Sequence, residues 1–287
     1  MSIKAVLWAS AVASVLCAAV LAQDPPPPPQ PPEGYPPAQG YPQQAAPALT
    51  PPQLDDLVGR IALYPDPLLA QVLTGSTFWN DIPAAAAWAN QHGYLRADEL
   101  SRAMYEDNLS FDPSVLALIP FPSVLDTMAK DPGWTQALGN AVLTQRPDVM
   151  DAVQRMRQKA LDAGYLEGNS QDRVVVAGPG DIEILPVNPG YVYVPYYDPR
   201  LVFVARRPGF FAGVGITFGP GIFVGAFAPF GWAGPVMGWR THEIVIDHRP
   251  WARTWVNRDR YVHSYAVPVA RPVGPRVERH VERRERR

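Results

Sequence analysis

Hydrophobic residues between positions 53 and 165 recur three and four residues apart, which is the spacing of one face of a helix. Prolines interrupt this pattern repeatedly, as Pro65 and Pro67 do on either side of Asp66. The clearest helix has Pro147 in its first turn and ends at Gly164. The region therefore predicts a compact bundle of short helices, which are expected around positions 54–61, 68–73, 80–88, 98–105, 112–113 and 147–164.

Between positions 166 and 207 the pattern changes to the shorter period of strands. Runs rich in valine and isoleucine occupy positions 174–176, 182–184 and 191–195. Asn188-Pro189-Gly190 is a turn signal between the last two runs. We expect a short antiparallel β meander after the helical bundle, and hence an α+β fold class.

Positions 208–239 are rich in glycine and aromatic residues and contain no charged residue. Two pairs of glycines four residues apart, at 215 and 219 and at 221 and 225, flank Pro220. This spacing lets helices pack closely in a membrane, but the proline argues against one continuous helix. A hairpin of positions 215–218 and 222–224, or an irregular loop, is therefore favoured. Either form is expected to expose an apolar surface, and insertion of positions 209–238 into a membrane is the alternative.

The first 22 residues have the pattern of a secretory signal peptide. Lys4 precedes an apolar run from Ala5 to Leu21, and Ala22 fits the position before cleavage. An uncleaved anchor is the alternative, although the run is shorter than the about 20 apolar residues that span a bilayer. A leucine stands directly before Cys17, where a lipoprotein signal needs a small residue. We expect an exported protein, periplasmic or associated with the outer membrane, without a lipid on this cysteine.

The proline content indicates that a second segment, after the signal peptide, has no fold of its own. Thirteen of the 34 prolines lie between Pro25 and Pro52, and proline runs favour an extended chain without internal hydrogen bonds. Positions 23–52 are therefore expected to form a disordered linker. Because the single cysteine lies in the signal segment, the exported chain is expected to contain no disulfide and no cysteine nucleophile.

The net charge of −2 results from the cancellation of two unlike regions. Positions 53–165 contain 14 acidic and 8 basic residues, whereas positions 240–287 contain 12 arginines and 6 acidic residues. The latter are expected to form a basic, largely disordered tail. An exported protein has little access to nucleic acid, so the expected partners are an envelope protein, anionic lipid or lipopolysaccharide.

Two segments carry a family resemblance. Positions 57–73 read LVGRIALYPDPLLAQVL, with Arg60, Tyr64, Pro65, Asp66 and Pro67 at the centre of the motif, and positions 191–199 read YVYVPYYDP. In this order, after a proline-rich linker, they resemble the bacterial family known as domain of unknown function 3300. The resemblance covers roughly positions 53–205 and implies an exported protein, often proposed to be a lipoprotein. It implies no activity, and many members end in Asn-, Trp- or His-rich tails rather than in arginine.

Aromatic side chains are the candidates for contact with a ligand or partner. The tyrosines of positions 191–197 are suited to stacking on sugar rings or a peptide, and lining of a sheet face is the alternative. The candidate contact residues are Tyr191, Tyr193, Tyr196, Tyr197, Trp232 and Trp239.

Catalytic and metal-binding motifs are missing from the sequence: there is no nucleophile elbow, zinc-binding H-E-x-x-H or phosphate-binding loop. His242 and His248 flank a strand signal and would lie roughly 20 Å apart at about 3.3 Å per residue, too far for one metal ion. Asp66 is expected to serve a turn or helix cap. The alternative is a carboxylate pair with Glu106 or Asp107. We expect no metal and no cofactor.

These observations favour a non-enzymatic cell-envelope protein that binds a membrane surface or an envelope partner through its aromatic, glycine-rich and basic C-terminal half. Two alternatives remain open at the level of the sequence. One is an envelope glycan or peptide hydrolase that uses carboxylates of the helical region. The other is a protein that inserts positions 209–238 into a membrane. The sequence indicates no oligomeric state.

Overall fold

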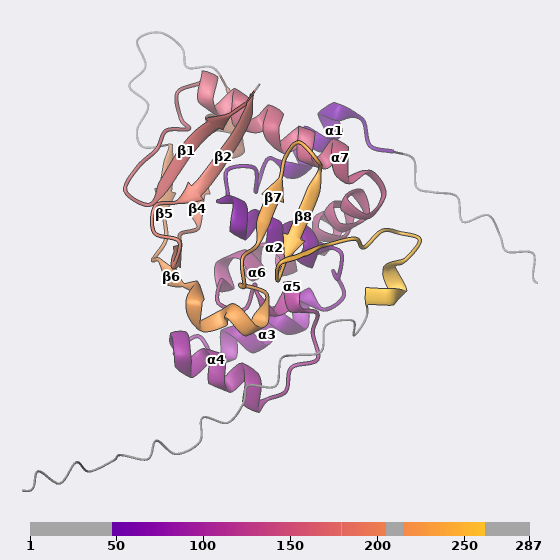
Figure 1. Ribbon diagram of the computed structural model, residues 1–287, viewed down its shortest axis with the longest axis vertical. Coiled ribbons are helices and arrows are strands. Elements are labelled where there is room, and N and C mark those ends of the chain that lie inside the picture. Colours follow the sequence, from indigo (N-terminus) through magenta and orange to yellow (C-terminus); the bar gives the residue numbers. More distant parts are fainter. Residues whose placement is uncertain (1–47, 179, 205–214, 262–287) are drawn as a thin grey trace, which may run out of the picture. The chain divides into compact units, whose positions relative to one another are not determined.

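The computed structural model describes residues 48–178, 180–204 and 215–261. The expected signal peptide at 1–22, most of the linker at 23–52, positions 208–214 of the apolar segment and positions 262–287 of the tail lie outside the described residues. Within the described residues, helices come first and short antiparallel strands follow (Figure 1). The α+β class expected from the hydrophobic pattern is therefore confirmed.

Short helices build the N-terminal part of the fold, as the proline punctuation predicts. Every helix before the strands except α4 has proline at its first or second position, where the missing N–H group would have no partner inside the helix. The helices are α1 (Pro51–Val58), α2 (Asp66–Ser76), α3 (Ile82–Gln91), α4 (Ala97–Glu106), α5 (Pro113–Leu116), α6 (Pro122–Lys130) and α7 (Pro132–Asp162). The sequence pattern did not reveal α6.

The last of these helices is longer than its sequence signals indicated. Gln145 has non-helical backbone angles, φ −143° and ψ 46°, so α7 consists of two helical pieces that meet at a kink. The second piece contains Pro147 near its start and is the helix expected from the hydrophobic pattern. Gly164, with φ +68°, follows its end, a conformation that glycine adopts without strain.

The strands differ from the expected meander in their pairing. β1 (Asp172–Ala177) and β2 (Asp181–Pro186) form an antiparallel hairpin, with Val174 opposite Ile184. β3 (Tyr191–Val192) pairs with β6 (Ile222–Phe223), and β4 (Pro195–Tyr197) pairs with β5 (Ile216–Phe218). Strands were correctly expected at positions 216–218 and 222–223, but they pair with β4 and β3 rather than with each other. The tyrosine-rich and glycine-rich segments thus form two ribbons with one another.

The chain from position 236 to 250 forms a further antiparallel sheet, although most of it was assigned to a disordered tail. Its strands are β7 (Val236–Gly238), β8 (Glu243–Ile246) and β9 (Arg249–Pro250). β7 and β8 contact α2, and Figure 1 shows this hairpin in front of that helix. Ile244, Ile246 and Trp251 are buried in the main core. The strand signal between His242 and His248 corresponds to β8. The basic composition misled the expectation of disorder for the segment around it, because the apolar residues of these short strands are buried against the helices.

The described part of the apolar segment also contributes to the core, so it is less exposed than expected. Helix η1 (Val224–Phe230) follows β6, and Phe227, Phe230 and Trp232 are buried against the helices. Two short helices complete the described chain, α8 (Pro199–Val202) and η2 (Arg258–Tyr261). Among the described residues, no helix combines the length and apolar character needed to cross a bilayer.

Candidate functional site

The family-like motif at positions 57–73 is organised around a buried ion pair. Asp66 opens α2 between Pro65 and Pro67, but its side chain does not form the expected helix cap, since Pro65 is the N-cap residue and no side chain caps this helix. Its Oδ1 atom lies 2.7 Å from Nη1 of Arg157 in α7, and both side chains are almost fully buried. Its Oδ2 atom accepts a hydrogen bond of 2.9 Å from Nε1 of Trp239.

Arg157 links four parts of the chain. Its guanidinium group donates hydrogen bonds to the backbone oxygens of Ala62, Tyr64 and Ile182 at 2.7–3.0 Å, and lies 4.7 Å from the ring centroid of Trp239. A buried ion pair needs such additional hydrogen bonds, because desolvation of the two charges is costly. The Arg157 guanidinium is buried and bonded to several parts of the chain. We therefore interpret the Asp66–Arg157 ion pair as a structural joint, a buried contact that holds these parts together, rather than as an open binding site.

The other motif residues are placed around this joint. The Arg60 guanidinium is half exposed and forms an ion pair of 2.9 Å with Asp131. Tyr64 is buried, and burial raises the pKa of its phenol above the ordinary value. The Tyr197 hydroxyl accepts a hydrogen bond of 3.2 Å from the Leu63 backbone.

The candidate contact aromatics separate into exposed and buried groups. Tyr191 and Tyr196 are exposed, and the Tyr191 ring lies 5.4 Å from that of exposed Phe223. Tyr193 and Tyr197 are half-buried.

Both tryptophans named as contacts are buried, contrary to that expectation. Trp232 donates its indole N–H to the Ala117 oxygen at 2.8 Å, and Trp239 donates its own to Asp66. A buried indole usually needs an acceptor for its single N–H group, and both of these indoles have one. Of the six candidate contact residues, Tyr191 and Tyr196 are the exposed ones.

Glycines of the apolar segment lie against aromatic rings. A Cβ atom built on Gly221 would lie 2.7 Å from the ring of Tyr193, and one on Gly219 would lie 3.1 Å from that of Tyr196. These glycines are adjacent in space to tyrosines of the partner ribbon strands. Their spacing thus accommodates rings across the ribbons, and close packing of a membrane helix is not needed to explain it.

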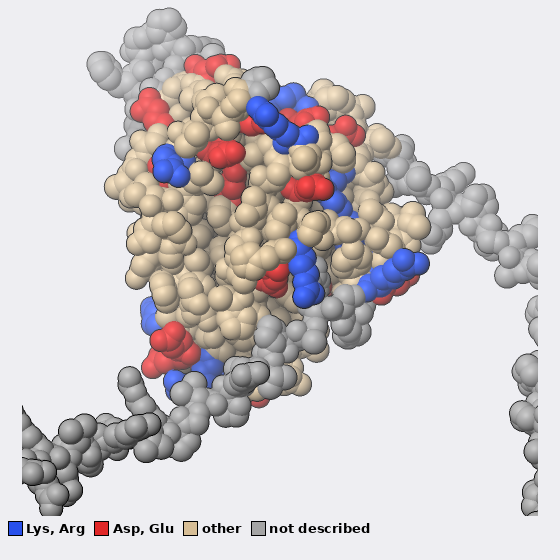
Figure 2. Space-filling model, viewed as in Figure 1, with Lys and Arg blue, Asp and Glu red and all other residues tan. Residues whose placement is uncertain are grey.

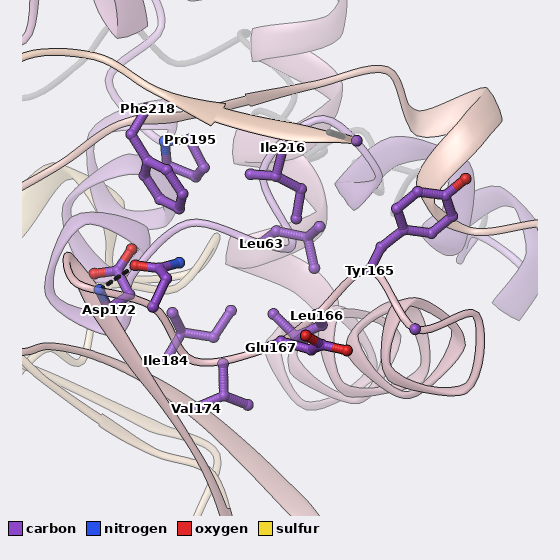
Figure 3. A pocket seen from close by; sticks show the side chains of 13 residues that line it. Leu63, Tyr165, Leu166, Glu167, Asp172, Val174, Ile184, Pro195, Ile216 and Phe218 are labelled. Carbon is purple, nitrogen blue, oxygen red and sulfur yellow. Dashed lines mark hydrogen bonds between the residues drawn. The ribbon is translucent and has the colours of Figure 1, made fainter. Parts of the chain in front are cut away.

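A pocket lies where the end of α7, the β1–β2 hairpin and the β4–β5 ribbon meet (Figure 3). Its volume of about 450 Å³ is within the range of small-molecule sites. A second, smaller hydrophobic cluster surrounds it, with Leu63, Leu166 and Ile184 as shared members. The pocket is lined by Leu63, Gly164, Tyr165, Leu166, Glu167, Asn169, Asp172, Val174, Ile184, Pro195, Gly215, Ile216 and Phe218.

Asp172 is the unusual residue of this pocket. It is the first residue of β1 and only 3% exposed, and Figure 3 shows it at the end of the pocket opposite Tyr165. Its Oδ1 atom is buried without a hydrogen-bond partner among the described residues. Burial raises the pKa of the Asp172 carboxyl to about 7, because apolar surroundings disfavour the charged form. Perturbed groups of this kind concentrate at functional sites.

Two more polar residues lie in the pocket wall. Asn169 Oδ1 accepts hydrogen bonds from the backbone N–H groups of Gln171 at 2.8 Å and Asp172 at 2.9 Å, which holds the start of β1 in place. Glu167 is exposed and adds a second carboxylate. Within the described part of the chain, no lysine, arginine or histidine lines the pocket, so this part of its wall is both apolar and acidic.

The carboxylates first considered for hydrolysis lie in separate environments. Asp66 is enclosed with Arg157, whereas Asp107 lies at the surface and accepts a hydrogen bond of 2.8 Å from Trp88 Nε1. Glu106 is exposed at the end of α4. Within the part of the chain that the structure describes, no three side chains of metal-binding type come together. The sequence signals did not identify the Asp172 pocket.

Comparison of the chain with known proteins identifies the family to which it belongs. The chain is similar to the protein named "Uncharacterized protein YacH" from Escherichia coli (strain K12), with 33% identity over 182 residues, or 53% of this chain and 29% of the relative. The match thus spans less than a third of that relative's length. No solved structure matches the chain. The family described as "Protein of unknown function (DUF3300)" matches residues 50–269, and the chain therefore belongs to this family.

Proposed function

We propose that this chain is a non-enzymatic binding protein of the bacterial cell envelope, and that the pocket around Asp172 holds its ligand. The observation that carries the proposal is an almost fully buried aspartate that lines a mainly apolar pocket and whose Oδ1 atom has no hydrogen-bond partner among the described residues. An unsatisfied buried polar atom costs about 1–3 kcal/mol, and a ligand that supplies the partner offsets that cost. Export is supported by the signal-like pattern at positions 1–22.

The exposed aromatic residues support contact with an envelope protein in addition. Tyr191, Tyr196 and Phe223 are exposed on the two ribbons. Figure 2 shows no charged side chain over β5 and β6 in this view. Tyrosine and phenylalanine of this kind are enriched in protein interfaces. The alternative partners, anionic lipid or lipopolysaccharide, are proposed for the arginines of positions 262–287, which lie outside the described residues.

Titration with a small apolar probe tests the pocket. In the full chain labelled at its methyl groups, n-octanol is expected to shift the resonances of Leu63, Val174, Ile184 and Ile216. Those of core residues outside the pocket, such as Leu138, are expected to stay in place. Shifts spread evenly over the core would contradict a defined site.

A pocket-filling variant sharpens this test. Val174→Phe is expected to reduce n-octanol binding at least about tenfold, because the larger ring occupies the cavity. Val176→Phe is the matched control, since Val176 lies on the same strand, is exposed and does not line the pocket. Equal binding by both variants would place the probe elsewhere.

An envelope hydrolase is the second candidate, because two carboxyl groups, those of Asp172 and Glu167, line one pocket. Paired carboxyls with different ionisation serve as acid and base in glycan hydrolysis, and Asp172 has the raised pKa of an acid. Release of reducing ends from cell-wall glycan by the full chain, lost in both Asp172→Asn and Glu167→Gln, would favour this candidate. Absence of release together with ligand binding would favour the binding protein.

A further inference from the structure

The two nearly buried aspartates of the fold differ in their electrostatic partners. Asp66 has the Arg157 guanidinium at 2.7 Å. Among the described residues, no basic side chain forms an ion pair with Asp172, and its Oδ1 atom lacks any hydrogen-bond donor. A buried carboxylate is retained at low cost only when a cation or several donors accompany it. Asp172 thus lacks the partner that the protein supplies to Asp66.

The rest of the pocket defines what a partner must look like. Leu63, Ile216 and Phe218 are among the apolar residues that line it, and Figure 3 shows Leu63 and Ile216 between Asp172 and Tyr165. A ligand that fills the volume must therefore have an apolar body. Glu167 adds negative charge, and none of the described residues that line the pocket is basic, so these residues would repel an anionic end.

We propose that the pocket binds a cationic amphiphile, a small molecule with an apolar body and a protonated amine or guanidinium group that pairs with the Asp172 carboxylate. This inference rests on the proposed function, because it names the ligand class for the same pocket. An ion pair formed on a carboxylate that is almost fully buried gains more coulombic free energy than one between two exposed side chains. Burial of the ligand's apolar body provides most of the binding free energy, and the Asp172 carboxylate selects a ligand with a positive charge.

Three probes of equal length separate the ligand's charge from its apolar body: n-octylamine, n-octanol and n-octanoate, titrated into the methyl-labelled full chain at pH 8. At this pH the amine is protonated and the Asp172 carboxyl is largely ionised. We expect the amine to bind at least about tenfold more tightly than the alcohol, as a charge-assisted hydrogen bond does. We expect the carboxylate to bind most weakly.

Asp172→Asn is expected to bring the affinities for amine and alcohol within about twofold of each other. Glu167→Gln is the matched control and is expected to keep most of the preference, because Glu167 is exposed and screened by solvent. Equal binding of amine and alcohol by the native chain would overturn the inference while leaving a binding pocket in place. So would an amine preference that persists in Asp172→Asn. Failure of all three probes to bind would overturn the proposed function as well.

Discussion

Asp66 and Asp172 show how the surroundings of a single carboxyl group separate a structural role from a ligand-binding role. Asp66 receives Arg157 and the Trp239 indole, so its charge is compensated inside the fold. Asp172 receives no partner for its Oδ1 atom among the described residues, and its pKa rises to about 7 through burial. The uncompensated group should therefore reduce stability at neutral pH.

Asp172→Asn is expected to raise the free energy of unfolding at pH 8 and to change it little near pH 4. The folded-state pKa of about 7 exceeds the ordinary value of 3.8, so between these values the folded chain binds more protons than the unfolded chain. The free energy of unfolding of the native chain therefore falls as the pH rises through this window and is level above it. At about 1.4 kcal/mol per pKa unit, the gain is on the order of a few kcal/mol.

Urea unfolding measured from pH 4 to 8 checks this prediction. Among the described residues, the other titratable groups that line the pocket are Tyr165 and Glu167, and Glu167→Gln is the control. Burial also raises the pKa of Asp112, to about 6, so the variant keeps a slope below that pH. The decisive interval is pH 6–7, and a native-like slope there in Asp172→Asn would contradict the prediction.

At the scale of secondary-structure elements, the contact between α2 and α7 depends on a glycine. Gly139 lies in α7 and is buried. A Cβ atom at this position would overlap the backbone oxygen of Ser76, and would lie 3.0 Å from the Cα atom of Thr77. Because these are backbone atoms at the end of α2, neither can move aside without shifting a helix.

Gly139→Ala is accordingly expected to lower the free energy of unfolding by about 1–3 kcal/mol or more, as overpacking does. Gly133→Ala is the matched control in the same helix, where the nearest atom is the Asp131 carboxylate at 3.9 Å. It is expected to be neutral or stabilising, since alanine exceeds glycine in helix propensity by up to about 1 kcal/mol. Denaturant midpoints of the two variants measure the difference, and equal midpoints would contradict the role of the close approach.

At the scale of the whole described fold, the residues after β8 hold the C-terminal part on the helices. Trp251 is buried, and the Arg146 guanidinium lies 4.7 Å from its ring centroid and donates a hydrogen bond of 3.0 Å to its backbone oxygen. The Trp255 backbone N–H donates to the Leu143 oxygen at 3.2 Å. These contacts extend the folded part well beyond position 240.

Trp251→Ala is expected to lower the free energy of unfolding by about 3–5 kcal/mol, as loss of a buried aromatic ring does. Val256→Ala, at a position 94% exposed, is expected to stay within about 0.5 kcal/mol of the native chain. Thermal unfolding monitored by near-ultraviolet circular dichroism compares them. Equal stability of the two variants would contradict this prediction and would support the disordered tail that composition suggested from position 240.

Several of these residues left a signal in the sequence that hydrophobic patterning can reveal. Arg157 lies four residues after Val153 and three before Ala160, on the apolar face of the expected helix, and a charge there indicates a buried partner. Asp172 lies two residues before Val174, so strand alternation places both on one face. Neither signal identifies Asp66 as the partner of Arg157 or shows that the Asp172 Oδ1 atom lacks one among the described residues, because partners come from distant segments of the chain.

The sequence alone determined the α+β class, the short proline-started helices and most of the strand positions. These follow from local chemistry: the period of apolar residues, the absent N–H of proline and the conformational freedom of glycine. Tertiary structure alone decided that β3 and β4 pair with the glycine-rich segment, that Trp232 and Trp239 are buried, and that a pocket forms at Asp172. Each of these depends on contacts between residues far apart in the chain, whose free energy comes from packing and desolvation rather than from local pattern.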